Sequence, residues 1–172
     1  APVQAKTACL LTDGILFAGT GLWIYSYADR QLHSLPIINK GKAINDYFKY
    51  IKPWKKNTYV VGTQWKGVYL YHTDSHQLTP FTSCKKQHIS SYFIDKQKNL
   101  WLSPYGEGMI CYDVNGQEIA RYSTQNSDLC NDIILDMLIY KDELWIATDG
   151  GGIARLNLAD RTFRTIEQQS GN

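Results

Sequence analysis

Short hydrophobic runs separated by polar turns recur along the whole chain with a period of about 43 residues. Each copy carries an aromatic residue in a central run, a small hydroxyl residue two to four positions later, and a glycine that opens the next run. The aromatic residues are Phe17, Tyr59, Trp101 and Trp145, the hydroxyl residues are Thr20, Thr63, Ser103 and Thr148, and the glycines are Gly21, Gly67, Gly108 and Gly152. A period of this length with strand-like content indicates a stacked or radial β architecture.

Four strand-like runs are visible within one copy. In the fourth copy they span 133–140, 144–148, 152–158 and 162–166, and in the third copy 90–95, 100–103, 108–114 and 117–122. Gly, Asp, Asn or Lys marks each break, as turns require. Residues 43–51 have some helical spacing of aromatic residues, but they lie where the first strand of the second copy belongs, and we predict a strand there.

Four antiparallel strands in a repeat of this length are typical of a β-propeller blade. We therefore predict an all-β fold of about four four-stranded antiparallel blades in a single domain. The expected blades span 5–36, 43–82, 88–123 and 131–167. Because the chain starts and stops near repeat boundaries, we expect it to be a fragment of a longer protein, in which it forms part of a larger, seven-bladed propeller.

The amino-acid composition limits the classes of molecule that this fragment is expected to bind. The 172 residues are 44% hydrophobic, 20% charged and 13% aromatic, with twelve tyrosines and a formal net charge of +2. This charge is too small, and the basic residues too scattered, for a nucleic-acid partner of this fragment. No apolar run approaches the roughly 20 residues that span a membrane, and no signal-peptide pattern is present.

The third and fourth copies resemble the two-component regulator propeller repeat, whose pattern includes Asn-Leu-Trp-Ile-Gly-Thr, a Gly-rich turn, Gly-Leu-x-x-Tyr-Asp and a closing Phe-x-x-Tyr. The matching segments are 99–103, 143–148, 150–153, 111–113 and 163–166. The first two copies are weaker, because Phe17 and Tyr59 replace Trp and the first copy lacks the three-residue turn between Thr20 and Gly21. The resemblance spans nearly the whole chain, in four copies.

The resemblance implies a function in signalling. Members of this family are mostly periplasmic sensor regions of bacterial hybrid two-component systems, especially in gut bacteria that degrade glycans. It therefore implies a periplasmic, ligand-sensing part of an inner-membrane protein, with histidine kinase and DNA-binding parts further along the full protein. Neighbouring blades or domains of that protein are expected partners. The outermost blades of an incomplete propeller have open edges, so we also expect a homo-oligomer.

Candidate ligand-binding residues lie on one propeller face. The connections between second and third strands, and those between blades, emerge on that face; the latter include Asn39-Lys40, 83–86 and 125–131. Large aromatic residues at hairpin tips could stack on a sugar ring while polar neighbours bind its hydroxyl groups. The candidates are Trp65, Lys66, Tyr105, Glu107 and Asp149. The alternative is that these rings cover the edge of a neighbouring blade.

Other residues are better explained by structure than by chemistry. The four repeated aromatic residues fit a core between blades. Cys9 and Cys111 fit the hydrophobic cores of strands. Cys84 and Cys130 lie in connections between repeats, and the sequence leaves open whether they form a disulfide. His72 and His76 flank one turn, but two ligands rarely hold a metal. The Gly-x-Ser-x-Gly pattern of a nucleophile elbow is absent. The glycines at 150–152 do not form a phosphate-binding loop, because no helix is expected to follow them. We expect no catalytic residue, metal or cofactor.

Two functions remain. The first is a sensor fragment that binds a glycan-derived oligosaccharide and performs no chemistry. The second is a structural module whose faces dock protein partners or a twin subunit without a small ligand. An enzyme would need a cluster of acidic residues or histidines on one face, which this sequence does not show.

Overall fold

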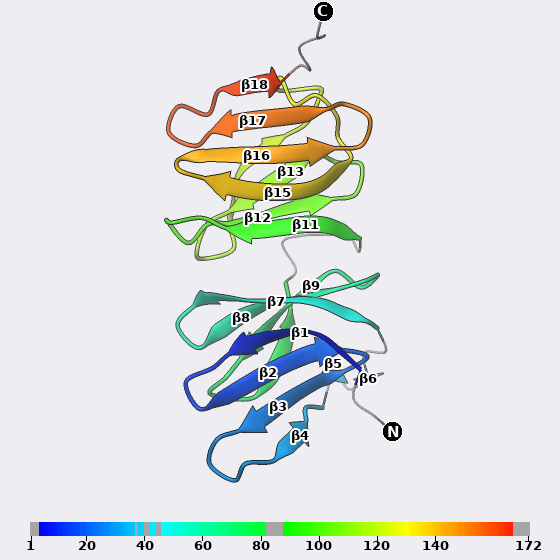
Figure 1. The fold of residues 1–172 in the computed structure, drawn as a ribbon, viewed down its shortest axis with the longest axis vertical. Coiled ribbons are helices and arrows are strands. Elements are labelled where there is room, and N and C mark those ends of the chain that lie inside the picture. Colours follow the sequence, from blue (N-terminus) through cyan, green and yellow to red (C-terminus); the bar gives the residue numbers. More distant parts are fainter. Residues whose placement is uncertain (1–3, 37, 40–41, 44–45, 82–87, 167–172) are drawn as a thin grey trace, which may run out of the picture. The chain divides into compact units, whose positions relative to one another are not determined.

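The computed structural model describes residues 4–36, 38–39, 42–43, 46–81 and 88–166, and all regular elements among them are β-strands (Figure 1). The chain forms two compact units, Ala1–His88 and Ile89–Asn172, each of which contains two four-stranded antiparallel sheets. The all-β prediction of four four-stranded blades is therefore confirmed. None of the described residues belongs to a helix long and apolar enough to cross a membrane.

The first unit contains two blades and a small two-stranded sheet. The strands of the first blade are β1 (Ala5–Leu10), β2 (Gly14–Gly19), β3 (Leu22–Ser26) and β4 (Leu32–Ser34). The small sheet pairs β5 (Ile38–Asn39) with β6 (Lys42–Ala43). The strands of the second blade are β7 (Phe48–Lys55), β8 (Thr58–Thr63), β9 (Val68–His72) and β10 (Gln77–Pro80). In each blade every strand pairs with its neighbours in sequence.

The second unit repeats the plan twice. The strands of the third blade are β11 (Ile89–Ile94), β12 (Leu100–Pro104), β13 (Met109–Tyr112) and β14 (Glu118–Tyr122). The strands of the fourth blade are β15 (Ile134–Tyr140), β16 (Glu143–Thr148), β17 (Ile153–Asn157) and β18 (Phe163–Ile166).

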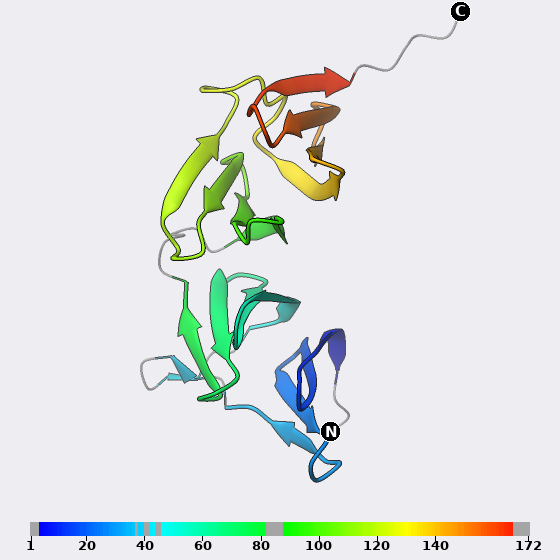
Figure 2. The same ribbon diagram turned by 90° about the vertical axis from the view of Figure 1, so that its left-hand side faces the viewer.

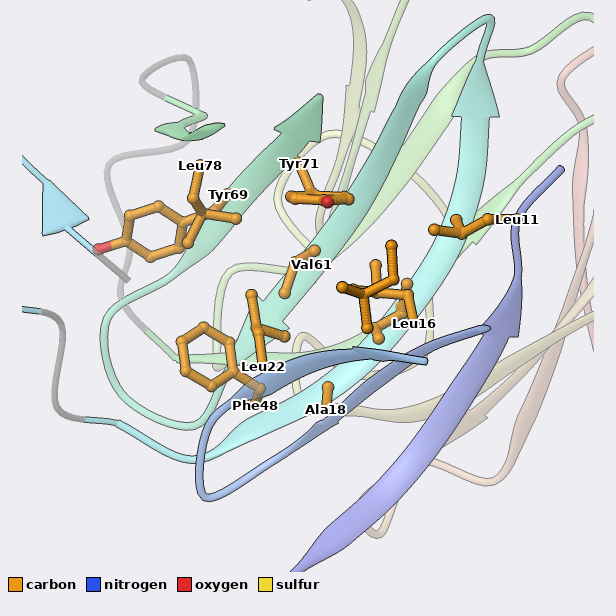
Figure 3. Close-up of a cluster of buried hydrophobic side chains, with 11 residues drawn as sticks. Leu11, Leu16, Ala18, Leu22, Phe48, Val61, Tyr69, Tyr71 and Leu78 are labelled. Carbon is orange, nitrogen blue, oxygen red and sulfur yellow. The ribbon is translucent and has the colours of Figure 1, made fainter. Parts of the chain in front are cut away.

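Each unit has its own hydrophobic core, in which one face of a blade contacts one face of the next (Figure 2). In the first unit Leu16 and Leu22 of the first blade meet Phe48, Val61 and Tyr71 of the second (Figure 3). In the second unit, Phe93, Trp101 and Met109 of the third blade meet Leu144, Ile146 and Leu156 of the fourth. Burial of these apolar faces stabilises each pair of blades by roughly 25 cal/mol for every Å² removed from water.

A β-bulge near the start of the first strand recurs in all four blades. The register shifts between Ala5 and Thr7, Phe48 and Tyr50, Ile89 and Ser91, and Ile134 and Asp136. Across the sheet, the first residues of these pairs face Gly19, Thr63, Pro104 and Thr148. This bulge therefore gives a structural alignment of the repeats that does not depend on residue type.

The structural alignment corrects the predicted set of equivalent aromatic residues. On the second strand of each blade, the residue three positions before the one that faces the bulge is structurally equivalent in all four copies. These equivalent residues are Leu16, Val60, Trp101 and Trp145. Phe17 and Tyr59 are each one residue away from these positions, so they lie on the opposite face of their strands. Trp101 is fully buried, Tyr59 packs partly buried against the first core, and Phe17 and Trp145 are only half-buried. The prediction that all four occupy the same core position is wrong.

The repeated hydroxyl residues and glycines close the turn between the second and third strands. Thr63 donates a hydrogen bond to the Gly67 carbonyl over 2.8 Å, and Thr148 does the same to Gly152 over 2.9 Å. Ser103 donates to the Gly108 carbonyl over 3.1 Å. Thr20 has no such role, because its turn is shorter and its side chain is exposed.

The first strand of the second blade lies further along the chain than expected. We predicted a strand over 43–51, whereas β7 spans Phe48–Lys55 and Ala43 belongs to the small sheet. Pro53 lies within β7, where it is tolerated because β7 is an edge strand of its sheet.

Candidate functional site

Trp65 and Lys66 lie on the turn between β8 and β9, which is held by a carboxylate from outside the turn. The carboxylate of Asp46, just before β7, accepts hydrogen bonds from the backbone N–H groups of Trp65 and Lys66, each over 2.9 Å. It also accepts one from the Tyr47 N–H over 2.7 Å. Hydrogen bonds to a charged acceptor are stronger than those to a neutral one. The turn is therefore anchored to the start of the blade.

The Trp65 side chain projects from this anchored turn. It is 58% exposed, although its backbone is fixed. Its indole lies beside the imidazole of His88, with ring centroids 5.2 Å apart and planes inclined by 38°. An exposed indole on a fixed backbone presents a flat apolar surface to a ligand at low cost in conformational entropy.

Tyr105 and Glu107 lie on the corresponding turn of the third blade, between β12 and β13. The Glu107 N–H donates to the Pro104 carbonyl over 3.1 Å, and Gly106 and Gly108 adopt positive φ angles of 72° and 69°. Tyr105 is 50% exposed and Glu107 half-buried. The aromatic ring therefore again sits at the tip of a hydrogen-bonded turn.

Asp149 lies on the turn between β16 and β17 of the fourth blade and is exposed. The connection between the third and fourth blades joins its turn to that of Tyr105. In this connection, the Asn131 side chain donates to the Asp149 carbonyl over 2.7 Å, and the Asp132 carbonyl accepts from the Gly108 N–H over 2.9 Å. Tyr105, Glu107 and Asp149 consequently share one end of the second unit.

The predicted site residues thus form two groups. Trp65 and Lys66 belong to the first unit, and the other three belong to the second. The expected contribution of Lys40 and of 83–86 falls outside the described residues, as does Cys84. As predicted from the sequence, each candidate residue lies on a turn between the second and third strands of its blade.

Sequence reasoning missed the residues that hold these turns, namely Asp46, Asn131 and Asp132. A signal for them is present, because the dipeptide Asn-Asp occurs at 45–46 and again at 131–132, two repeats later. A single residue separates each dipeptide from the first strand of a blade. Short polar residues at such a position can hydrogen-bond to neighbouring backbone groups.

Among the residues that the structure describes, the histidines and cysteines show no arrangement suited to catalysis. His72 contacts the Thr79 hydroxyl over 3.0 Å, whereas His76 contacts the Tyr71 hydroxyl over 2.8 Å. No group of three or more potential metal ligands occurs among the described residues. Cys111 is a free thiol, and burial raises its pKa to about 12, so it stays protonated at neutral pH and is a poor nucleophile. The arrangement on the turns can bind a ligand through exposed rings and polar neighbours.

No protein-family model matches the sequence, and no curated protein matches it either. Solved structures, by contrast, share its fold. The extracellular domain of the hybrid two-component system BT4673 from B. thetaiotaomicron matches 95% of the chain with a TM-score of 0.73 and 17% identity. The extracellular domain of the hybrid two-component system BT3049, from the same organism, matches 98% with a TM-score of 0.67 and 13% identity.

These matches cover only part of the larger domains. The chain corresponds to 25% of the BT4673 domain and 29% of the BT3049 domain. It also matches the computationally designed Ika4 protein over 91% of its own length and 92% of that protein, with a TM-score of 0.64 and 9% identity. The chain therefore shares the fold of about a quarter of the extracellular domain of such hybrid two-component systems.

Proposed function

We propose that this chain is a ligand-sensing part of the extracytoplasmic, periplasmic region of a hybrid two-component sensor. It binds a glycan-derived oligosaccharide, and the histidine kinase of the full protein lies in another part. The observation that carries the proposal is the exposed Trp65 indole on a turn that Asp46 anchors. Tyr105, on an equivalent turn, gives a second exposed ring. The likeness in fold to extracellular domains of hybrid two-component systems supports the sensor role.

Signalling by such a sensor requires that the ligand has different affinities for two arrangements of the protein. A ligand that binds one arrangement of the propeller and its neighbouring domains more tightly than another shifts the population towards that arrangement. In a dimeric sensor this shift changes how the subunits associate. The fragment itself then needs no catalytic group.

Substitution of the exposed rings tests the proposal. We expect Trp65→Ala to weaken oligosaccharide binding at the turn of the first unit, and Tyr105→Ala to weaken it at the turn of the second unit. With ligands selected from a glycan array, each loss should be about tenfold or more, because truncation of an aromatic anchor removes on the order of 2 kcal/mol. Calorimetric titration measures the affinity. The melting temperature should stay nearly unchanged, because both side chains are exposed.

Tyr27→Ala provides the matched control. Tyr27 is 48% exposed and lies on the turn between β3 and β4, at the other end of its blade from the turns that carry the candidates. Its substitution should leave the affinity unchanged. If Trp65→Ala and Tyr105→Ala unfold the protein, or bind as well as the unsubstituted chain, the proposed site is wrong.

A protein-interaction module is the second candidate, and the fourth blade favours it. Leu144 and Ile146 of β16 face the third blade, so the alternate residues of this blade form its outer face. On this outer face Leu138 is 67% exposed and Ile153 is 43% exposed. They border an apolar hollow of about 200 Å³ beside Trp145. An exposed apolar face of this kind suits a second protein surface.

A further inference from the structure

The second unit contains a cavity at the end opposite to Tyr105. The cavity has a volume of about 260 Å³ and lies between three turns, those joining β11 to β12, β15 to β16, and β17 to β18. Its wall includes a guanidinium, two amide side chains and an apolar surface, from Arg161, Gln97, Asn99, Ile139 and Leu158. Residues from two blades therefore form one pocket.

Two cationic side chains, Lys96 and Arg161, line this cavity. Among the described residues, the Arg161 guanidinium has no carboxylate partner. Its guanidinium lies over the indole of the buried Trp101, 5.2 Å from the ring centroid. Its backbone is fixed at the tip of the turn, with a positive φ of 63° and a 2.9 Å hydrogen bond from its N–H to the Asn157 carbonyl. The charged group is thus held in place by stacking and by the turn.

The two carboxylates of the cavity are occupied by other partners. Asp95 accepts hydrogen bonds from the Asn99 N–H over 2.8 Å, from the Asn99 side-chain amide over 2.9 Å and from the Trp101 indole N–H over 3.0 Å. Asp142 pairs with the Lys96 ammonium over 3.0 Å. Since Lys96 already has its counter-ion, Arg161 is the group that can receive an anion from solution.

The remaining wall suggests what kind of anion fits. Ile139 and Leu158 supply an apolar surface that can contact the face of a small ring. The side chains of Gln97 and Asn99 supply amide groups that can bind hydroxyl groups. The volume is slightly below the range of pockets that hold drug-sized ligands, so a single ring is the appropriate size. The carboxylates of Asp95 and Asp142 disfavour a dianion such as phosphate.

We propose that this cavity binds a small hydroxylated ring that carries one carboxylate, such as a hexuronate, through a bidentate contact with Arg161. The planar guanidinium matches the geometry of a carboxylate. No residue of the turns that carry Trp65 and Tyr105 lines this cavity, so the inference does not depend on the proposed function.

Titration of the protein with D-glucuronate tests the inference. We expect saturable binding by calorimetry or by NMR chemical-shift change, at least about tenfold tighter than binding of D-glucose, which has a similar ring without the carboxylate. Arg161→Gln should weaken glucuronate binding by about tenfold or more, and Arg161→Lys should weaken it less, because lysine keeps the charge but loses the bidentate contact.

Arg164→Gln is the matched control, because Arg164 is an exposed arginine on β18 that lies outside the cavity. It should bind glucuronate as the unsubstituted protein does. Melting temperatures of all variants verify that each is folded. If Arg161→Gln is not folded, Ala159→Leu, which fills the cavity without changing charge, should cause the same loss of binding.

Several results would overturn the inference. These are no saturable glucuronate binding at millimolar concentration, equal affinity for glucose, equal weakening by Arg161→Gln and Arg164→Gln, or equally tight binding of inorganic phosphate. Tyr105→Ala separates this site from the proposed sensor site. If that substitution abolishes glucuronate binding while Arg161→Gln does not, the ligand binds at the turns and the cavity is not its site.

Discussion

Trp101 and Trp145 occupy equivalent positions of two blades, but their surroundings differ. The Trp101 indole N–H donates to Asp95, whereas the buried indole nitrogen of Trp145 has no partner among the described residues. The turn between β15 and β16 is shorter, and Tyr140 stands where the third blade has Asp95. A half-buried Trp145 lies instead near the guanidinium of Arg155, 5.7 Å from the ring centroid. Identical residue types in a repeat therefore need not contribute equally to stability.

This difference predicts unequal effects of the same substitution. Trp101→Ala should lower the free energy of unfolding by about 3–5 kcal/mol, because it removes a fully buried ring and one of the three hydrogen bonds that Asp95 accepts. Trp145→Ala should cost less, about 1–2 kcal/mol, because part of that ring is already in contact with water. Urea denaturation measures both values. Equal losses would contradict the assigned environments.

The sequence could predict that aromatic residues mark each repeat, but it could not show which face they occupy. Phe17 and Tyr59 were aligned with the tryptophans by residue type, whereas the bulge aligns Leu16 and Val60 with them. Side chains alternate between faces with a period of two, so an error of one residue moves a side chain to the other face. A bulge adds one residue to one strand without any fixed sequence signal.

The turns between the second and third strands of the blades show how accurately strands and turns could be predicted from the sequence. The hydroxyl–glycine pairs seen in the sequence correspond to real hydrogen bonds in three blades. Strand bounds in the third and fourth blades agree with the prediction within about two residues. The start of β7 was misplaced, because the strand was expected over 43–51, whereas Ala43 belongs to the small sheet and β7 spans Phe48–Lys55. Pro53 lies within β7, which its edge position allows. Edge and central strands cannot be distinguished before the sheet order is known.

Two glycines of one turn give a matched test at this scale. A Cβ on Gly108 would lie 2.1 Å from the Tyr122 carbonyl oxygen, whereas a Cβ on Gly106 would meet nothing within 4 Å. Both have positive φ angles, so both Ala variants carry a similar backbone penalty of about 1–2 kcal/mol. Gly108→Ala should destabilise by about 1–3 kcal/mol more, because the backbone must also move. Thermal denaturation of the two variants checks this; equal melting temperatures would contradict it.

At the scale of the whole molecule, the repeat period was sufficient to predict four four-stranded sheets, because the number of strand-like runs in each copy fixes the sheet. The ligand site was harder to predict. The sequence could place Trp65 and Tyr105 on equivalent turns, but it could not show that Asp46 anchors one turn and that Asn131 and Asp132 join the others. Arg161 gave no sequence signal, because a lone arginine in a turn is common and its cavity forms only when two blades meet.

The outer face of the fourth blade predicts self-association if the chain acts as an interaction module. The purified chain should then form a dimer or larger species at micromolar concentration, as measured by light scattering. Leu138→Lys combined with Ile153→Lys should make it monomeric without lowering its melting temperature, because both side chains are exposed. Ile119→Lys, at an exposed position on β14, is the control and should not change the mass. A monomeric unsubstituted chain would exclude self-association through this face.

The pairing of every blade strand with its neighbours in sequence also determines how the protein folds. All four blade sheets are made of successive hairpins, so their hydrogen bonds join residues that are close along the chain. Short loops close quickly, and proteins rich in local contacts fold faster than β-sandwiches with distant pairings. The strand pairing within a blade can therefore begin early in folding, whereas the hydrophobic core of a unit forms only when both of its blades are present.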